Sequence, residues 1–184
     1  MVEPFTWRVA TRDDIPSILA LMDAAIVENM KGFLDEAGVA AARETMGLDT
    51  TLIDDGTYFL VLPVEPDPTR SDIAGCGGWS WRSTLYGGDQ VAGRDDTKVD
   101  PTDGAARIRA MYTHPSWTRC GVGTYLLTLG ENAARDAGYS WIELGSTEAG
   151  EPLYRARGYE PFDYHRNTGA NGVPNLVTLM RKAL

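Results

Sequence analysis

The sequence predicts a mixed α/β fold, in which helices pack against the faces of one β-sheet. Segments whose apolar residues recur at helical spacing alternate with short segments rich in apolar, aromatic and β-branched residues, which favour strands. The chain of 184 residues shows no internal repeat and no linker, and its length fits one domain, which we expect to span residues 1–184. The predicted order is strand, two helices, three strands, helix, strand, helix and two strands.

The N-terminal half begins with a short candidate strand at residues 7–10, and residues 11–14 supply caps for a helix that continues to about residue 30. Pro16 falls in the first turn of this helix, where its missing N–H is tolerated. A weaker helix is expected over residues 35–46, followed by a hairpin of strands at residues 57–62 and 72–82. The second of these strands contains three glycines, which indicate a bulge or a close backbone approach: Gly75, Gly77 and Gly78.

The C-terminal half opens with a loop over residues 83–104, which is long for a compact domain and is therefore expected to be functional or mobile. A strand at residues 106–113 leads through a turn into a helix over residues 121–137, which Gly138 terminates. We then expect a strand at residues 139–145 and a short helix at residues 150–157. A final pair of strands is expected at residues 159–165 and 176–181.

The charge and the cysteines exclude several classes of protein. Seventeen Lys and Arg against 26 Asp and Glu give a net charge of −9, which repels phosphate backbones and argues against a nucleic-acid partner. No apolar run is long enough to cross a membrane, and no secretory signal is visible, so we expect a cytoplasmic protein without a membrane partner. Cys76 and Cys120 are far apart and are expected to be reduced thiols, and with only His114 and His165 elsewhere no metal site is expected.

The most informative segment is RCGVGT, residues 119–124, at the start of the predicted helix 121–137. Two glycines one residue apart let the backbone approach a bound group, and the free N–H groups of a helix start favour an anion. Arg119 adds a positive charge. The spacing fits neither a dinucleotide fingerprint nor a P-loop, and tight turns also use glycine, so ordinary turn chemistry remains the alternative at this point.

The segment MYTHPSWTRCGVGTYLL, residues 111–127, resembles the acetyl-CoA-binding motif of the GNAT superfamily of N-acetyltransferases. A second segment, GEPLYRARGY at residues 150–159, is similar to the Leu-Tyr-x-x-x-Gly-Phe/Tyr segment of that family, and residues 7–16 are similar to its first strand and helix. The resemblance implies a central, mostly antiparallel sheet of six to seven strands flanked by about four helices. One position departs from the motif, because its leading Arg or Gln falls on Thr118, and Arg119 is the candidate to replace it.

This resemblance implies an N-acetyltransferase that moves an acetyl group from acetyl-CoA to a primary amine by direct transfer in a ternary complex. The backbone N–H groups of residues 119–124 would hold the pyrophosphate, and the strand end at residues 111–113 would lie beside the pantetheine. The implied cofactor-binding residues are Met111, Tyr112, Thr113, Arg119, Cys120, Gly121, Val122, Gly123 and Thr124. Core packing is the alternative role for the first two.

Two residues are candidates for the proton transfers that amide formation requires. Tyr154 resembles the family's proton donor to the CoA sulfur, with a half-buried packing residue as the alternative. Glu143 occupies a position similar to a glutamate that serves as base in some members. The alternatives are that Glu143 is a solvated carboxylate at the edge of the sheet, or that a water relay takes the proton and no direct base is required. His114 and His165 are weaker candidates, and His114 is expected to be a turn residue.

The acceptor side is expected to be built by the two N-terminal helices and the segment 79–89, with Trp79, Trp81 and Asp89 as the candidate substrate-binding residues. The loop 83–104 carries five aspartates and two cationic residues, a net charge of −3, so it would attract a cationic small amine or peptide amine toward the tryptophan faces. A simple solvated loop is the alternative, and a homodimer is left open. At the level of the whole protein, the alternatives are a non-catalytic acyl-CoA-binding sensor of the same fold and a CoA-independent phosphate-binding module.

Overall fold

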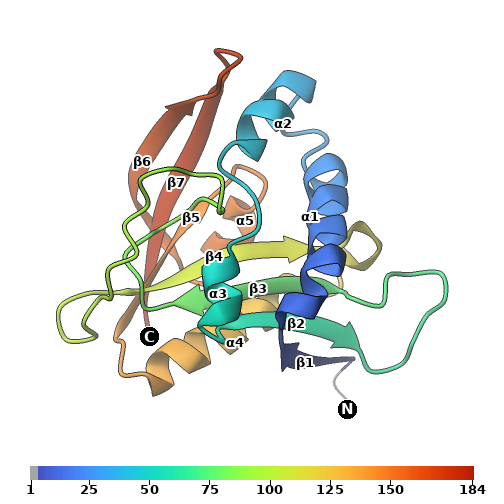
Figure 1. Cartoon of the computed structure of the whole chain (residues 1–184), viewed down its shortest axis with the longest axis horizontal. Coiled ribbons are helices and arrows are strands. Elements are labelled where there is room, and N and C mark those ends of the chain that lie inside the picture. The colour runs from blue at the N-terminus through green and yellow to red at the C-terminus, as the bar shows by residue number, and fades with distance from the viewer. Residues whose placement is uncertain (1–3) are drawn as a thin grey trace.

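A computed structural model describes residues 4–184, and Figure 1 shows a single twisted sheet with helices on both of its faces. The sheet has seven strands in the order β1-β2-β3-β4-β5-β7-β6. Every neighbouring pair is antiparallel except β4 and β5, which are parallel. The strands are β1 (Phe5–Val9), β2 (Tyr58–Pro63), β3 (Gly75–Ser80), β4 (Ala106–Thr113), β5 (Trp141–Ser146), β6 (Glu160–Thr168) and β7 (Pro174–Ala183).

Five α-helices accompany the sheet: α1 (Ile15–Asn29), α2 (Glu36–Arg43), α3 (Thr50–Asp54), α4 (Val122–Asp136) and α5 (Glu151–Ala156). Short 3-10 turns at Arg12–Asp14 and Pro115–Trp117 precede α1 and α4. In the view of Figure 1, α1 and α2 lie above the sheet and α4 lies below it. None of the helices among residues 4–184 is long and apolar enough to cross a membrane.

The core consists of two layers, one on each face of the sheet. Successive residues of β2 show the division, because Phe59 and Val61 pack in the layer beneath α4, whereas Tyr58 and Leu60 pack in the layer beneath α1. A strand covered on both faces needs apolar residues throughout rather than in alternation, which explains the uninterrupted apolar run at residues 57–62.

The predicted mixed α/β class and the predicted order of elements are confirmed, with one omission. The sequence prediction missed α3, whose five residues are too few to show a helical period, although Asp49 caps it by accepting a hydrogen bond from the backbone N–H of Thr51 at 3.1 Å. Residues 83–104 form a loop as expected. Its only described pairing is an isolated bridge between Arg82 and Lys98.

A bulge lies between β3 and β4, and its extra residue belongs to β4, opposite the glycine-rich strand β3. The register between β3 and β4 shifts between Cys76 and Gly78, so Gly77 faces an extra residue of β4. A Cβ atom on Gly78 would lie 2.2 Å from the carbonyl oxygen of Thr57, so the close backbone approach at this point requires glycine. In β4 the irregularity is accompanied by a left-handed backbone at Ala110, with φ of 48°.

Candidate active site

The parallel pair β4 and β5 separates soon after it forms, and this separation creates the main cleft. Only Ala106 with Ile142 and Arg107 with Glu143 are in register, so the later residues of β4 are not paired with β5. A cleft of about 830 Å³ lies where the strands diverge. We call it the central cleft. Its walls come from α1, the end of β4, the turn before α4, the first turn of α4 and α5.

One end of the central cleft is the start of α4. Gly121 lies outside the first turn with φ of 90°, a conformation that favours glycine, and no side chain caps the helix. The main-chain N–H of Tyr125 bonds the Gly121 carbonyl at 2.9 Å, so the N–H groups of Val122, Gly123 and Thr124 precede the first hydrogen bond of the helix. This end of the cleft is therefore suited to an anion, because free N–H groups and the helix dipole both favour negative charge there.

The two glycines of this turn have different roles. A Cβ atom on Gly121 would meet nothing within 4 Å, so the space beside it is open to a ligand. A Cβ atom on Gly123 would lie 2.7 Å from Cδ2 of Leu153, which means that Gly123 allows α4 to pack closely against α5. The sequence predicts that both glycines let a ligand approach the backbone. In the structure, open space for a ligand lies beside Gly121, whereas the side chain of Leu153 fills the space beside Gly123.

The structure brings most of the predicted cofactor-binding residues to one surface. The central cleft is lined by Met111, Tyr112, Thr113, Arg119, Gly121, Val122, Gly123 and Thr124. Cys120 is exposed and does not line the cleft; its thiol approaches the Thr118 carbonyl oxygen at 3.5 Å. Thr118 itself lines the cleft, and the backbone of Arg119 is left-handed with φ of 61°.

The bulge in β4 fixes the strand at the point where it leaves β5. The hydroxyl of Tyr58 donates to the Ala110 carbonyl oxygen at 2.8 Å, and burial raises the pKa of Tyr58 well above its usual value, so this donor stays protonated. At the far end of β4, the Asn29 amide donates to the Thr113 carbonyl oxygen at 2.8 Å and ties the strand to α1. Both contacts hold the strand wall of the cleft in a defined position.

Tyr154 of α5 lines the central cleft and also a smaller cavity of about 100 Å³. We call this second space the loop cavity, because residues of the loop 83–104 form part of its wall. The hydroxyl of Tyr154 makes no hydrogen bond with the described residues, and burial raises the pKa of Tyr154 to about 12. A phenol in this setting keeps its proton at neutral pH and has a free direction in which to donate it.

Glu143 does not reach the cleft. Its carboxylate is bonded by Arg107 at 2.9 Å and approached by Arg181 at 3.3 Å, and it lines neither the central cleft nor the loop cavity. Strand alternation places Ile142 and Leu144 in the core beneath α4 and turns Glu143 to the other face. Burial lowers the pKa of Arg107, and the neighbouring Glu143 charge opposes this shift, so the two form a structural ion pair.

The three predicted acceptor-binding residues also lie away from the cleft. Trp79 is buried in the layer beneath α4, where its ring contacts those of Trp81 at 5.5 Å and Tyr139 at 6.2 Å. Asp89 accepts hydrogen bonds from the backbone N–H of Thr50 at 3.1 and 3.2 Å. None of the three lines the central cleft or the loop cavity, so their placement lends no support to an acceptor role.

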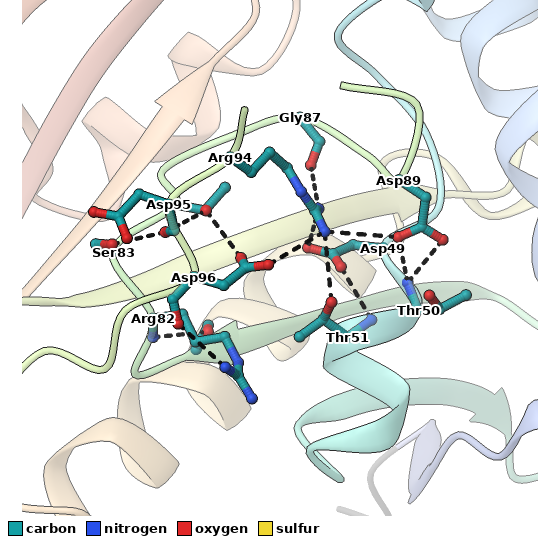
Figure 2. Close-up of polar contacts among 12 residues, drawn as sticks. Asp49, Thr50, Thr51, Arg82, Ser83, Gly87, Asp89, Arg94, Asp95 and Asp96 are labelled. Atoms are coloured by element: carbon teal, nitrogen blue, oxygen red, sulfur yellow. Dashed lines mark hydrogen bonds and ion pairs between the residues drawn. The ribbon is translucent and has the colours of Figure 1, made fainter. Parts of the chain in front are cut away.

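Four of the five aspartates of the loop 83–104 accept hydrogen bonds from nearby backbone or hydroxyl groups, and three of these four are exposed. Figure 2 shows the Arg94 guanidinium between three carboxylates, with Asp49 at 3.0 Å and Asp89 and Asp96 at 3.8 Å. Asp49 is fully buried and also accepts from Arg109 at 2.8 Å. Arg94 therefore offsets part of this negative charge, but the loop keeps five aspartates against two cationic residues, and its attraction for cationic substrates stays a prediction.

The histidines have local partners. Nδ1 of His114 accepts from the backbone N–H of Ser116 at 3.1 Å, which makes it the cap of the turn at Pro115–Trp117, and burial lowers its pKa. His165 is hydrogen-bonded through Nδ1 to the hydroxyl of Tyr86 at 3.1 Å. Met46 and Tyr86, which line the loop cavity, fall within the segments that the sequence assigned to the acceptor side. Sequence reasoning missed Thr147, because no local pattern distinguishes it from an ordinary loop residue.

Comparisons with known proteins agree with this geometry. A family model described as an acetyltransferase (GNAT) domain matches residues 71–161. No curated protein matches the chain. Among solved structures, a GCN5-related N-acetyltransferase from Rhodopseudomonas palustris has a TM-score of 0.70 at 16% identity and covers 100% of this chain and 98% of its own.

Two further solved structures were determined with a ligand of this class. A GNAT superfamily phosphinothricin acetyltransferase from Sinorhizobium meliloti, in complex with acetyl-CoA, has a TM-score of 0.63 at 17% identity and covers 99% of this chain and 89% of its own. The PaiA N-acetyltransferase from Thermoplasma acidophilum, in complex with coenzyme A, has a TM-score of 0.60 at 12% identity and covers 99% of this chain and 100% of its own. At these identities the likeness concerns the fold.

Proposed function

Because this chain is a GNAT-superfamily acetyltransferase, we propose that it transfers the acetyl group of acetyl-CoA to a primary amine while both substrates are bound. The observation that carries the proposal is the central cleft, which is lined both by the start of α4 with its free N–H groups and by the protonated phenol of Tyr154. The two neighbours solved with acetyl-CoA or coenzyme A support the choice of donor. No metal is part of the proposal.

The start of α4 would hold the pyrophosphate of the donor. The backbone N–H groups near Gly121 have no helical partners, and the space beside Gly121 is open. Arg119 makes no ion pair with any residue from 4 to 184, so its charge is available to the same anion. The pantetheine arm would then lie along residues 111–113, in the gap that the divergence of β4 and β5 leaves.

The proton balance assigns one role to Tyr154. As the amine nitrogen forms its bond to the acetyl carbon, the carbon–sulfur bond breaks and the leaving thiolate takes a proton from the Tyr154 hydroxyl. The amine must lose a proton, and no Asp, Glu or His among residues 4–184 lines the central cleft or the loop cavity. Water is therefore the acceptor of that proton, in place of Glu143.

The direct test is release of free thiol from acetyl-CoA with a panel of primary amines, with the products identified by mass spectrometry. Thiol release that depends on the amine, together with a product heavier by one acetyl group, is the expected result. Tight binding of acetyl-CoA without transfer to any amine would favour the sensor. A thermal shift with inorganic pyrophosphate but none with CoA would favour the phosphate-binding module.

A further inference from the structure

A third cavity, of about 140 Å³, opens beside the central cleft between the end of α1, the residues before α5 and the β6–β7 hairpin. We call it the hairpin cavity, and in Figure 1 the β6–β7 hairpin rises beside α2 at this side of the molecule. It shares Met30, Phe33, Thr147 and Ala149 with the central cleft. Thr147 lines all three cavities, so the hairpin cavity reaches the place where the central cleft meets the loop cavity.

Much of the hairpin cavity is apolar although it is open to solvent. Phe33 and Leu176 are 47% and 48% exposed, which is unusual for large apolar side chains that line a concave surface. Met30 and Leu34 extend the same wall. A ligand with an apolar body would cover this surface and gain hydrophobic stabilisation from it.

The polar groups of the hairpin cavity carry opposite charges that do not pair with each other. The side chains of Arg166 and Glu148 both line it, and neither side chain forms an ion pair or a hydrogen bond with any residue from 4 to 184. By contrast, Arg82, Arg94, Arg107 and Arg109 all have carboxylate partners. An unpaired cation and an unpaired anion in one cavity fit a ligand that itself carries both charges.

A buried amide adds a further polar contact. Asn175 lines the hairpin cavity and is only 9% exposed. Its Nδ2 donates to Oγ1 of Thr45 at 2.8 Å, whereas its Oδ1 has no donor among the described residues. This oxygen is open to the cavity and not sealed from solvent, so a ligand can donate a hydrogen bond to it, and an ammonium group is such a donor.

We propose that the amine acceptor is an apolar α-amino acid held in the hairpin cavity. Arg166 binds its carboxylate, because the guanidinium fork matches a carboxylate. Glu148 and Asn175 face its ammonium group, and the apolar side chain covers Phe33 and Leu176. The amino group then lies toward Thr147 and the central cleft. This inference rests on the proposed acetyl transfer, and it names the substrate class of that reaction.

The test measures binding and transfer separately. Three compounds with a similar apolar body are compared. L-leucine carries both an ammonium and a carboxylate group, 3-methylbutylamine carries the ammonium group alone, and 4-methylpentanoate carries the carboxylate group alone. Each is titrated calorimetrically into the full chain saturated with CoA, and thiol release from acetyl-CoA is measured with the two amines. Arg166→Gln is compared with wild type and with Arg135→Gln, a change to an exposed arginine of α4 outside the three cavities.

We expect wild type to bind L-leucine at least about tenfold more tightly than either one-charge analogue, the scale of one hydrogen-bonded charge. Arg166→Gln should abolish that preference over 3-methylbutylamine, and Arg135→Gln should keep it. Equal affinities in wild type, or a preference that survives Arg166→Gln, would overturn the inference. Selective binding of L-leucine with no transfer to any amine would refute the proposed reaction alone, and transfer to amines without carboxylate selection would refute the acceptor class alone.

Discussion

At the scale of the single residue, Tyr154 is the side chain on which the proposed chemistry depends most. Its hydroxyl is free of described partners and lies where the central cleft meets the loop cavity. Tyr154→Phe removes only that hydroxyl, so kcat should fall by about 10²-fold, a usual scale for general acid catalysis, while KM for acetyl-CoA stays unchanged. Tyr164→Phe, on an exposed ring of β6, is the control. Normal turnover in Tyr154→Phe would assign Tyr154 to packing.

The raised pKa of Tyr154 also predicts a pH dependence. Burial disfavours the phenolate, so the residue holds its proton until the pH approaches about 12 rather than the usual value near 10. The donor form is therefore complete throughout the neutral and moderately alkaline range. We expect kcat to show no alkaline decline between about pH 9 and 11, the range over which an unperturbed tyrosine loses most of its proton. A decline that disappears in Tyr154→Phe would contradict this account.

The two cysteines should differ sharply in reactivity. Cys76 is fully buried in β3, and burial raises the pKa of its thiol to about 12, so the reactive thiolate is absent at neutral pH. Cys120 is exposed beside the α4 turn. A disulfide reagent should therefore titrate one thiol in the folded protein and two after denaturation, and Cys120→Ser should abolish the native reaction. Two reactive thiols in the native state would show that the β3 layer opens readily.

At the scale of elements, Asp49 joins α3, β4 and the loop 83–104. It lies at the N-terminus of α3 and binds Arg109 of β4 and Arg94 of the loop. Burial lowers the pKa of Arg109, and Asp49 opposes that effect, so the carboxylate keeps the buried guanidinium charged. Arg109 in turn donates a hydrogen bond to the carbonyl oxygen of Gly87 at 2.6 Å, and Gly87 lines the loop cavity. The ion pair between Asp49 and Arg109 therefore supports the part of the cavity wall that the loop 83–104 forms.

Asp49→Asn keeps a capping group but removes the charge, which leaves Arg109 buried without a counter-charge. We expect the free energy of unfolding to fall by about 3–5 kcal/mol, the usual cost of breaking a buried pair, measured by urea denaturation. Asp54→Asn removes the partner of Arg12 in an exposed pair and should change stability little. Equal effects of the two substitutions would mean that the buried network contributes no more than surface charge does.

At the scale of the whole molecule, the predictable features are those written in local patterns. Apolar periodicity located α1 and α4, and the glycines of β3 predicted the close backbone approach that the structure shows at Gly78, whereas the bulge lies in the neighbouring strand β4. The turn at residues 119–124 and Tyr154 were placed on one cleft because two motifs far apart in the chain matched one known arrangement.

The acceptor side could not be predicted in the same way. Trp79 and Asp89 looked suitable by residue type, yet strand alternation turns the first into the core and a helix start uses the second. Thr147, Arg166 and Asn175 come from a loop and two strands, and only the tertiary arrangement brings them to one cavity. Composition also does not show that two aspartates of the loop 83–104, Asp89 and Asp96, share Arg94 with the buried Asp49.

The central claim is that the start of α4 holds the phosphates of acetyl-CoA, and calorimetric titration of acetyl-CoA into two matched variants tests it most directly. Gly121 and Gly138 lie at opposite ends of α4 with φ of 90° and 92°, and neither has a close neighbour at the Cβ position, so Gly121→Leu and Gly138→Leu impose similar backbone strain. Only Gly121 lines the central cleft. We expect affinity to fall at least about tenfold, or 1.4 kcal/mol, in Gly121→Leu and to stay at the wild-type value in Gly138→Leu. Equal affinities in the two variants would contradict the claim.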